Sequence, residues 1–304
     1  MNIATKISYS SPSPSVVALG CFDGVHLGHV SVIRRAVELA KELAAPCIVF
    51  TFDEPPKNLF LTEPTPLITS ADKKAELISS LGVDTLVSVP FTKEIAGLSP
   101  EEFAERILIK NLNAAHIVCG FNYTFGAKAQ GNTAFLADFC KARGIGLSAL
   151  PKLEIGNECV SSSLIREHIA RGEVEIAAKL LGRAYSISAK VISDKGLARK
   201  LGFPTANQVF SDKTLMPKNA VYATRARIGG KWLPAITNVG MRPTVNGGVR
   251  CAETHVIDFS GDLYGKELEI EFIAFIRDEQ KFDSIEALTK RVLGDIEAVK
   301  GMKI

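Results

Sequence analysis

The amino-acid sequence predicts a protein of two domains, an α/β domain with a parallel sheet followed by a small antiparallel β-sheet or barrel with a terminal helix. In the first half, short apolar runs alternate with segments of helical periodicity, whereas beyond Tyr185 five strand-like runs follow one another without helices between them. The period changes between Gly182 and Ser186, so we expect domains at 1–184 and 185–304. A chain of 304 residues, 46% hydrophobic and 23% charged, is long enough for two globular domains of ordinary size.

Five apolar runs in the first half are typical of buried strands, namely "SVVALGCF", "PCIVFTF", "GVDTLVSVPF", "HIVCGF" and "IGLSALP". Helices are expected between them, beginning near His26, Ser70, Ser99 and Thr133. The start at Ser99 is the best defined, because "SPEEF" combines a capping serine, a first-turn proline and a capping-box glutamate. Short apolar strands separated by helices indicate a parallel sheet covered on both faces.

The second half opens with two short helices, "SSSLIREHIARG" and "EVEIAAKLLG", each ended by a glycine. Strands are then expected in "YSISAKVIS", "AVYATRARIG", "WLPAITNVG", "CAETHVIDF" and "ELEIEFIAFI", linked by glycine-containing turns. A helical pattern returns only from Ser284 to about Val299. This order predicts the small antiparallel sheet or barrel and its C-terminal helix.

Charge and cysteine patterns argue against several classes of protein. The 36 basic and 33 acidic residues are spread along the chain without a basic cluster, so we expect no nucleic-acid partner. The apolar run Val16–Leu19 is too short to span a bilayer, so we expect no membrane anchor and no signal peptide, and a cytoplasmic location. The six cysteines form no C-x-x-C pair, and most lie in apolar stretches, which favours reduced and buried thiols.

The stretch "GCFDGVHLGH" (20–29) points most directly to chemistry. We expect it to join a strand to a helix at the carboxyl end of the sheet, where open α/β folds bind ligands. Gly24 and Gly28 allow close approach to the backbone, and a helix N-terminus favours anions. His26 and His29 would point to the same side, which favours a polyphosphate ligand. The alternatives are histidines that only cap or pack, or a metal site, although H-x-x-H lacks the i,i+4 spacing of helical zinc pairs.

This stretch resembles the signature of the nucleotidylyltransferase superfamily, and "CGFNYTFG" (119–126) and "VSSSLIR" (160–166) resemble later motifs of the prokaryotic FMN adenylyltransferases. The resemblance implies a Rossmann-like domain that transfers the adenylyl group of ATP to FMN and releases pyrophosphate. Without it, Asp23 would be a turn residue, Ser162 a helix cap and Arg166 a surface arginine. It implies His26 and His29 as catalytic residues, and as ATP- and phosphate-binding residues Gly20, Phe22, Asp23, His26, Gly28, His29, Asn122, Ser162 and Arg166.

The second half carries "LGFPTAN" (201–207), "NVGMRPT", "AETHVIDF" and "DLYGKELEIEFIAFIRDEQKFDS", which resemble the motifs of riboflavin kinases in the same order. The whole chain thus resembles the prokaryotic bifunctional riboflavin kinase/FAD synthetase family, which implies a barrel that phosphorylates riboflavin. The resemblance makes Glu253 the base for the 5′-hydroxyl of riboflavin, and Thr205 and Asn207 the oxygen ligands of Mg²⁺ and phosphate. From the residues alone, Glu253 is a solvated strand carboxylate, and Thr205 and Asn207 belong to a proline turn.

Further contacts are implied around these motifs. Gly196 and Lys200, with Arg199 near them, lie where a loop could wrap the ATP phosphates, although a flexible surface loop fits equally well. The flavin-binding residues implied are Asn122, Phe203, Arg277 and Glu279, although a charged strand end explains the last two more simply. The implied cofactor is Mg²⁺, the small-molecule partners are riboflavin, FMN and ATP, and transfer of flavin to apo-flavoproteins is left open. The oligomeric state is also left open.

One departure from the family pattern follows the second predicted strand. Where the family carries a P-H-P triplet, "TFDEPPK" places Pro55 at the histidine position, and proline has no side-chain donor. An alternative is therefore a chain that is mainly a riboflavin kinase with weakened FAD synthetase activity, unless Lys57 substitutes for the histidine. A further alternative is a flavin-sensing regulatory protein, against which the intact "LGFPTAN" and Glu253 argue.

Overall fold

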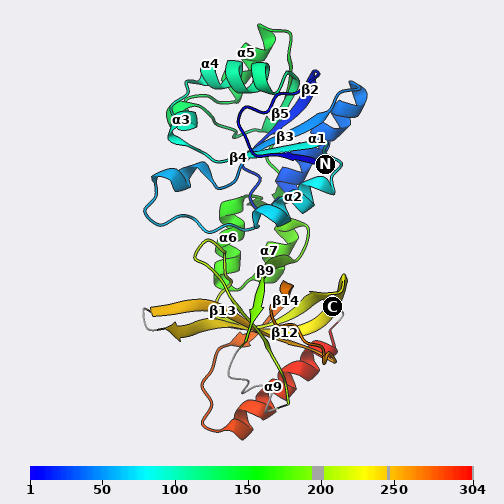
Figure 1. The fold of residues 1–304 in the computed structure, drawn as a ribbon, viewed down its shortest axis with the longest axis vertical. Helices are drawn as coiled ribbons and strands as arrows, with labels where there is room; N and C mark the ends of the chain where they lie inside the picture. Colours follow the sequence, from blue (N-terminus) through cyan, green and yellow to red (C-terminus); the bar gives the residue numbers. More distant parts are fainter. Residues whose placement is uncertain (194–201, 245–246, 303–304) are drawn as a thin grey trace. The chain divides into compact units, whose positions relative to one another are not determined.

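The structure is a computed structural model that describes residues 1–193, 202–244 and 247–302 (Figure 1). The chain divides into two compact units, Met1–Ser162 and Ser163–Ile304. Helices α6 (Ser162–Arg171) and α7 (Val174–Leu181) have the predicted extents, and α7 packs against the first and last strands of the second unit. A boundary at 184/185, where strand β9 begins, stays a prediction.

A six-stranded parallel sheet forms the centre of the first unit, as the alternating pattern predicts, with the order β1-β4-β3-β2-β5-β6. The five predicted strands are present, but the first ends at Leu19 rather than at Phe22. The edge strand β1, only three residues long, was not predicted. The strands are β1 (Asn2–Ala4), β2 (Ser15–Leu19), β3 (Cys47–Phe52), β4 (Thr85–Val89), β5 (Ala114–Gly120) and β6 (Gly146–Leu150).

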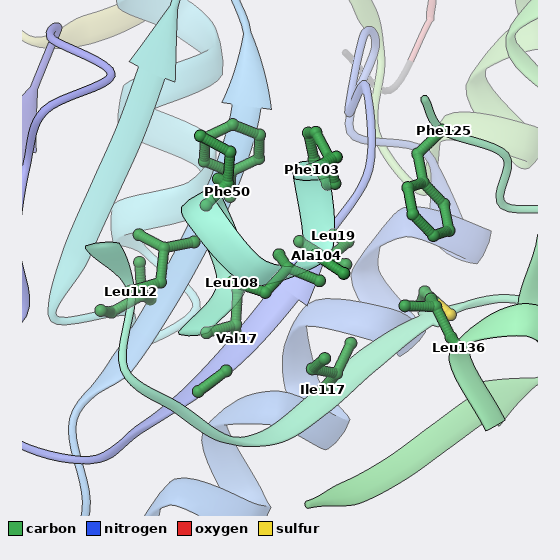
Figure 2. Packing of buried hydrophobic residues seen from close by; sticks show 14 of the residues in the cluster. Val17, Leu19, Phe50, Phe103, Ala104, Leu108, Leu112, Ile117, Phe125 and Leu136 are labelled. Carbon is green, nitrogen blue, oxygen red and sulfur yellow. The ribbon is translucent and has the colours of Figure 1, made fainter. Parts of the chain in front are cut away.

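Side chains of the central strands alternate between two cores. Val17 and Leu19 of β2 face one core, completed by α4 (Pro100–Phe103), the π-helix η2 (Ala104–Asn111) and α5 (Thr133–Lys141) (Figure 2). Val16 and Ala18 face the other core, completed by α1 (Leu27–Glu42) and α2 (Ala71–Ser79). Both faces of the sheet are therefore covered, as predicted for a parallel sheet.

Helix starts in the first unit follow the predicted capping chemistry. Ser99 and Glu102 form a capping box, and Ser70 and Asn132 each accept a hydrogen bond from the third residue beyond them. The structure differs from the prediction in that the helix begun at Ser99 widens into η2, whose i→i+5 geometry sequence periodicity does not reveal. Three short elements accompany the sheet, the helix α3 (Lys93–Ala96) and the 3-10 helices η1 (Pro56–Phe60) and η3 (Ala127–Ala129). The hairpin β7 (Glu154–Ile155) and β8 (Glu158–Cys159) precedes α6.

The second unit contains a closed antiparallel barrel with the order β10-β13-β12-β11-β14-β9. The five predicted strands are joined by a sixth, β10, which lies inside "LGFPTAN" and was not predicted because it is four residues long and follows a proline. Helix α9 (Ile285–Lys300) packs on the outside of the barrel, where Ile296 and Val299 contact Val221 and Ile236. The strands are β9 (Tyr185–Ile192), β10 (Ala206–Val209), β11 (Ala220–Ile228), β12 (Lys231–Thr244), β13 (Gly247–Val256) and β14 (Glu267–Asp278).

The structure bears on the predictions about the cysteines and about membrane-spanning segments. All six cysteines are free, and burial raises the pKa of Cys47 and of Cys119 to about 12, so these thiols are unreactive. Cys159, however, is exposed. Within the described part of the chain, no helix has both the length and the apolar character needed to cross a membrane.

Candidate active sites

Two predicted motifs meet at one point of the parallel sheet. From β2 the chain continues to β3 on one side and later returns to β5 on the other, so the strand order reverses at β2. Leu19 of β2 lies opposite Cys119 of β5, and "GCFDGVHLGH" and "CGFNYTFG" therefore begin side by side at the carboxyl edge. Such a switch point is where open α/β sheets bind ligands.

The loop after β2 has an unusual backbone. Phe22 and Val25 have positive φ angles of 49° and 39°, and Gly24 lies between them at 84°. A Cβ at Gly24 would also approach Ile68 Cδ1 to 3.1 Å. Non-glycine residues in this region carry strain that clusters at ligand sites, so the loop is held in a conformation that its own residues do not prefer.

The two histidines occupy the first turn of α1. His26 is the N-cap residue, and its Nδ1 accepts the backbone N–H of His29 at 3.2 Å. The two rings stack with centroids 3.5 Å apart, and His29 also meets the edge of Phe22 at 5.2 Å. His26 therefore caps α1, which is one of the alternatives that the sequence analysis gave for this residue. Phosphate binding by the two rings stays a prediction.

Asp23 is buried and anchors the loop to the segment before α2. Its carboxylate accepts the backbone N–H groups of Ile68, at 3.1 and 3.2 Å, and of Thr69, at 3.2 Å. Gly24 N–H returns a hydrogen bond to the Thr69 hydroxyl at 3.1 Å. The Asp23 carboxylate is occupied by these backbone amides. In this structure Asp23 therefore positions the loop.

The later motif residues differ in their placement. The Ser162 hydroxyl donates to the Asp23 carbonyl at 2.9 Å, which brings the start of α6 to the motif loop. Asn122 is exposed just beyond β5. Arg166 lies on α6 in the second compact unit.

The carboxyl end of β3 carries a cation that sequence reasoning missed. Lys74 of α2 is 3% exposed, and its Nζ donates to the carbonyl of Phe52 at 2.7 Å. Burial lowers the pKa of Lys74, and the electrostatic influence of Cys21, Asp23 and Asp53 opposes this shift. The sequence of α2 did not predict the burial of Lys74, because a lysine pair such as that in "ADKKAELIS" is typical of a solvated face.

A row of polar side chains crosses three adjacent strands of the barrel. Asn207 of β10 lies opposite Glu253 of β13, and Glu253 lies opposite Asn238 of β12. Directly opposite residues place their side chains on the same face, so the three form one carboxylate flanked by two amides. Asn238 belongs to "NVGMRPT", and the sequence alone predicted no role for it.

Neighbouring contacts hold the "FPTAN" segment against this row. Asn207 Nδ2 donates to Thr205 Oγ1 at 3.2 Å, so the two predicted metal ligands are adjacent. The ring Nδ1 of His255, two residues beyond Glu253, lies 2.9 Å from the Pro204 carbonyl. The motif "AETH" therefore both carries the carboxylate and fixes the segment that bears Thr205.

The predicted flavin contacts of the barrel have structural partners of their own. Phe203 is buried in the cluster under α9. The guanidinium of Arg277 pairs with Asp295 of α9 at 2.8 Å, and Glu279 accepts Asn238 Nδ2 at 3.3 Å. The predicted phosphate-loop residues Gly196, Arg199 and Lys200 lie outside the described residues.

A loop at the switch point of a parallel sheet, followed by a barrel with a row of one carboxylate and two amides, defines a two-module protein with a candidate site in each module. The FAD synthetase family profile matches residues 8–164, and the riboflavin kinase profile matches residues 181–303. The bifunctional riboflavin kinase/FMN adenylyltransferase of Pseudomonas fluorescens is 35% identical over 94% of this chain and 92% of its own length. That of Bacillus subtilis strain 168 is 36% identical over 92% and 90%. The chain belongs to the bifunctional riboflavin kinase/FMN adenylyltransferase family.

A solved structure supports the same fold over the whole chain. The crystal structure of a protein named a macrolide-efflux protein, from Streptococcus pneumoniae, superimposes with a TM-score of 0.91 at 30% identity and covers 100% of both chains. The likeness extends over both units, so that structure and this chain share the two-module architecture.

Proposed function

We propose that the barrel phosphorylates riboflavin to FMN and that the parallel-sheet module transfers the adenylyl group of ATP to FMN, forming FAD and pyrophosphate. The observation that carries this proposal is that each family motif set lies together in the fold. One set lies at the carboxyl ends of β2 and β5, and the other lies across β10, β13 and β12.

In the barrel, the oxygen of the riboflavin 5′-hydroxyl attacks the γ-phosphorus of ATP, and ADP leaves. We assign Glu253, which lies in the row between Asn207 and Asn238, to accept the hydroxyl proton. The amides of Asn207 and Asn238 flank the carboxylate and can orient the hydroxyl. After transfer, the proton resides on Glu253 and is released to water with the product.

Thr205 and Asn207 are the residues that would hold Mg²⁺. A hydroxyl oxygen and an amide oxygen are hard donors of the kind that Mg²⁺ shares with substrate phosphates, and the 3.2 Å contact from Asn207 Nδ2 to Thr205 Oγ1 keeps the two side chains adjacent. Such a site needs few protein ligands, because Mg²⁺ keeps several waters and binds the substrate phosphates. When bound, Mg²⁺ would neutralise charge on the transferring phosphate.

In the first module, a phosphate oxygen of FMN attacks the α-phosphorus of ATP and pyrophosphate leaves. The nucleophile is already an anion, so the site must align the groups and balance charge rather than remove a proton. We assign the phosphates to the N-terminus of α1 with His26 and His29, and to Asn122, Ser162 and Arg166. Asp23 holds the loop that presents these groups.

A second candidate is a riboflavin kinase with little adenylyltransferase activity. Pro55 is buried and precedes η1, so the position where the family carries a histidine has no side-chain donor, while Lys57 is exposed. Purified protein incubated with riboflavin, ATP and Mg²⁺ tests both candidates when the flavins are separated by chromatography. Accumulation of FAD supports the proposed function, arrest at FMN supports the second candidate, and unchanged riboflavin contradicts both.

A further inference from the structure

The buried lysine of α2 contacts the carboxyl end of β3, at the edge of the sheet to which we assign the substrates of adenylyl transfer. Asp23 and Asp53 are the acidic groups whose charge acts on Lys74, one from the loop after β2 and one just beyond β3. Both substrates of adenylyl transfer carry phosphate charge, so two carboxylates alone would repel them. One cation at this position cancels one of the two negative charges.

The surroundings of Lys74 tie three strands together at this edge. Its ammonium donates to the Phe52 carbonyl at 2.7 Å, and the neighbouring Thr51 hydroxyl donates to the Cys21 carbonyl at 2.8 Å. The Ser88 hydroxyl of β4 donates to the Asp53 carboxylate at 2.7 Å. The loop after β2 and the ends of β3 and β4 therefore form one hydrogen-bonded edge.

Burying an ammonium group costs free energy unless hydrogen bonds and opposite charges compensate for its lost hydration. Lys74 is 3% exposed, and within residues 1–193, 202–244 and 247–302 the structure gives it a carbonyl as hydrogen-bond partner and no carboxylate at ion-pair distance. Lys73, the next residue on the same helix, is partly buried and pairs at 3.1 Å with Glu76, whose side chain is 55% exposed. The two adjacent lysines thus differ in environment and serve as a matched pair.

We propose that Lys74 is a positioning residue of adenylyl transfer. Its charge offsets Asp23 and Asp53 so that the phosphates of ATP and FMN can approach, and its hydrogen bond to Phe52 fixes the end of β3 beside the motif loop. This inference rests on the proposed adenylyltransferase function. It assigns no contact between Lys74 and substrate.

The test measures kcat and KM for FAD formation from supplied FMN and ATP in Lys74→Met and in the matched control Lys73→Met. We expect kcat/KM to fall about tenfold or more in Lys74→Met, mainly through KM, and to stay unchanged in the control. Equal activity of the two variants overturns the inference. If the wild-type chain forms no FAD, the proposed function fails instead, and riboflavin phosphorylation in the same samples shows that the protein is otherwise active.

A charge-compensation cycle separates an electrostatic role from a merely structural one. Asp53→Asn keeps a side-chain oxygen for the Ser88 hydroxyl but removes one of the two carboxylates that Lys74 offsets. In Lys74→Met with Asp53→Asn, kcat/KM should recover at least in part, whereas a structural role predicts that the two losses add. Additive losses overturn the inference.

If Lys74→Met does not fold, the pH profile of Lys74→Arg decides. Burial lowers the pKa of Lys74, and Cys21, Asp23 and Asp53, the titratable groups that face it, oppose this shift. The lysine therefore loses its charge as pH rises through the lowered pKa, whereas arginine stays charged. FAD formation should fall at a lower pH in wild type than in Lys74→Arg, and coincident alkaline limbs overturn the inference.

Discussion

The imidazole of His26 accepts the backbone N–H of His29 at 3.2 Å and stacks on the His29 ring. An accepting Nδ1 carries no proton, so His26 is neutral in this arrangement and holds its proton on Nε2. The same side chain thus starts α1 and presents one ring donor. Protonation of His26 would remove the cap, which favours a neutral donor over an imidazolium at this position.

Two substitutions of His26 separate its role as the N-cap of α1 from the predicted role of its ring in binding phosphate. Asparagine is a good N-cap, so His26→Asn should keep the stability of the first unit, whereas His26→Ala should lose about 1 kcal/mol. Both should lose FAD formation if the imidazole handles phosphate. Thermal unfolding and FAD formation measured on both variants check this, and full activity in His26→Asn would show that capping is the main role.

Replacing His29 should affect one activity only. His29 contacts His26 and Phe22 within the motif loop and lies in the first compact unit, far along the chain from the barrel motifs. We expect His29→Ala to lose FAD formation by about 100-fold, as for removal of a group that stabilises transition-state charge, while FMN formation continues. Chromatography of flavins after incubation with riboflavin and ATP measures both, and loss of both activities would contradict independent modules.

Glu253→Gln should produce the reverse pattern. Glutamine fits the row between Asn207 and Asn238 but cannot accept the hydroxyl proton. FMN formation should fall about 100-fold or more, while supplied FMN is still converted to FAD. Glu267→Gln, at the exposed start of β14, is the control and should retain both activities. Unchanged FMN formation in Glu253→Gln would remove the base assignment.

Particular residues show what the sequence could and could not predict. Ser99, Pro100 and Glu102 form the expected capping box because capping is a local interaction. Strand β10 was missed because closing a barrel depends on partners distant in sequence, here Glu253 and Ala252. Lys74 was missed for the same reason, since its burial arises when α2 docks beside β3. Asn238 became a candidate only through its register with Glu253.

His116 of β5 should make the first unit less stable in mild acid. Its ring lies against Gly146 and its Nε2 is 2.9 Å from the Ser148 hydroxyl. Burial, and then the charge of Arg35, lower its pKa. The unfolded chain therefore binds a proton more readily, and stability is lost as pH falls below about 6.5.

The comparison with His116→Gln isolates this effect from other titrating groups. Glutamine can still hydrogen-bond to Ser148 but does not titrate. Urea unfolding at several pH values between 7.5 and 5 should show a smaller acid-side loss in the variant than in wild type. A loss of the same size in both proteins would exclude His116 as its source.

The pair Arg277 and Asp295 should be the strongest single tie between β14 and α9. The side chains are 13% and 5% exposed, and Nε of Arg277 donates to Asp295 Oδ2 at 2.8 Å. Arg291 of α9 reaches the other carboxylate oxygen at 3.2 Å. Removing the carboxylate leaves a largely buried guanidinium without its ion-pair partner, so Asp295→Ala should cost about 3 kcal/mol.

Trp232, the only tryptophan of the chain, lies on β12 and reports on the barrel by fluorescence during urea unfolding. The control is Asp258→Asn. Asp258 is 83% exposed, and its carboxylate lies 3.6 Å from the ammonium of Lys300 in α9. Asparagine tolerates the positive φ of 56° at this position. An exposed ion pair contributes about 0.5 kcal/mol at most here, so the control should unfold near the wild-type midpoint. Equal shifts in the two variants would mean that α9 is held by its apolar contacts with Val221 and Ile236, and that the buried ion pair adds no net stability.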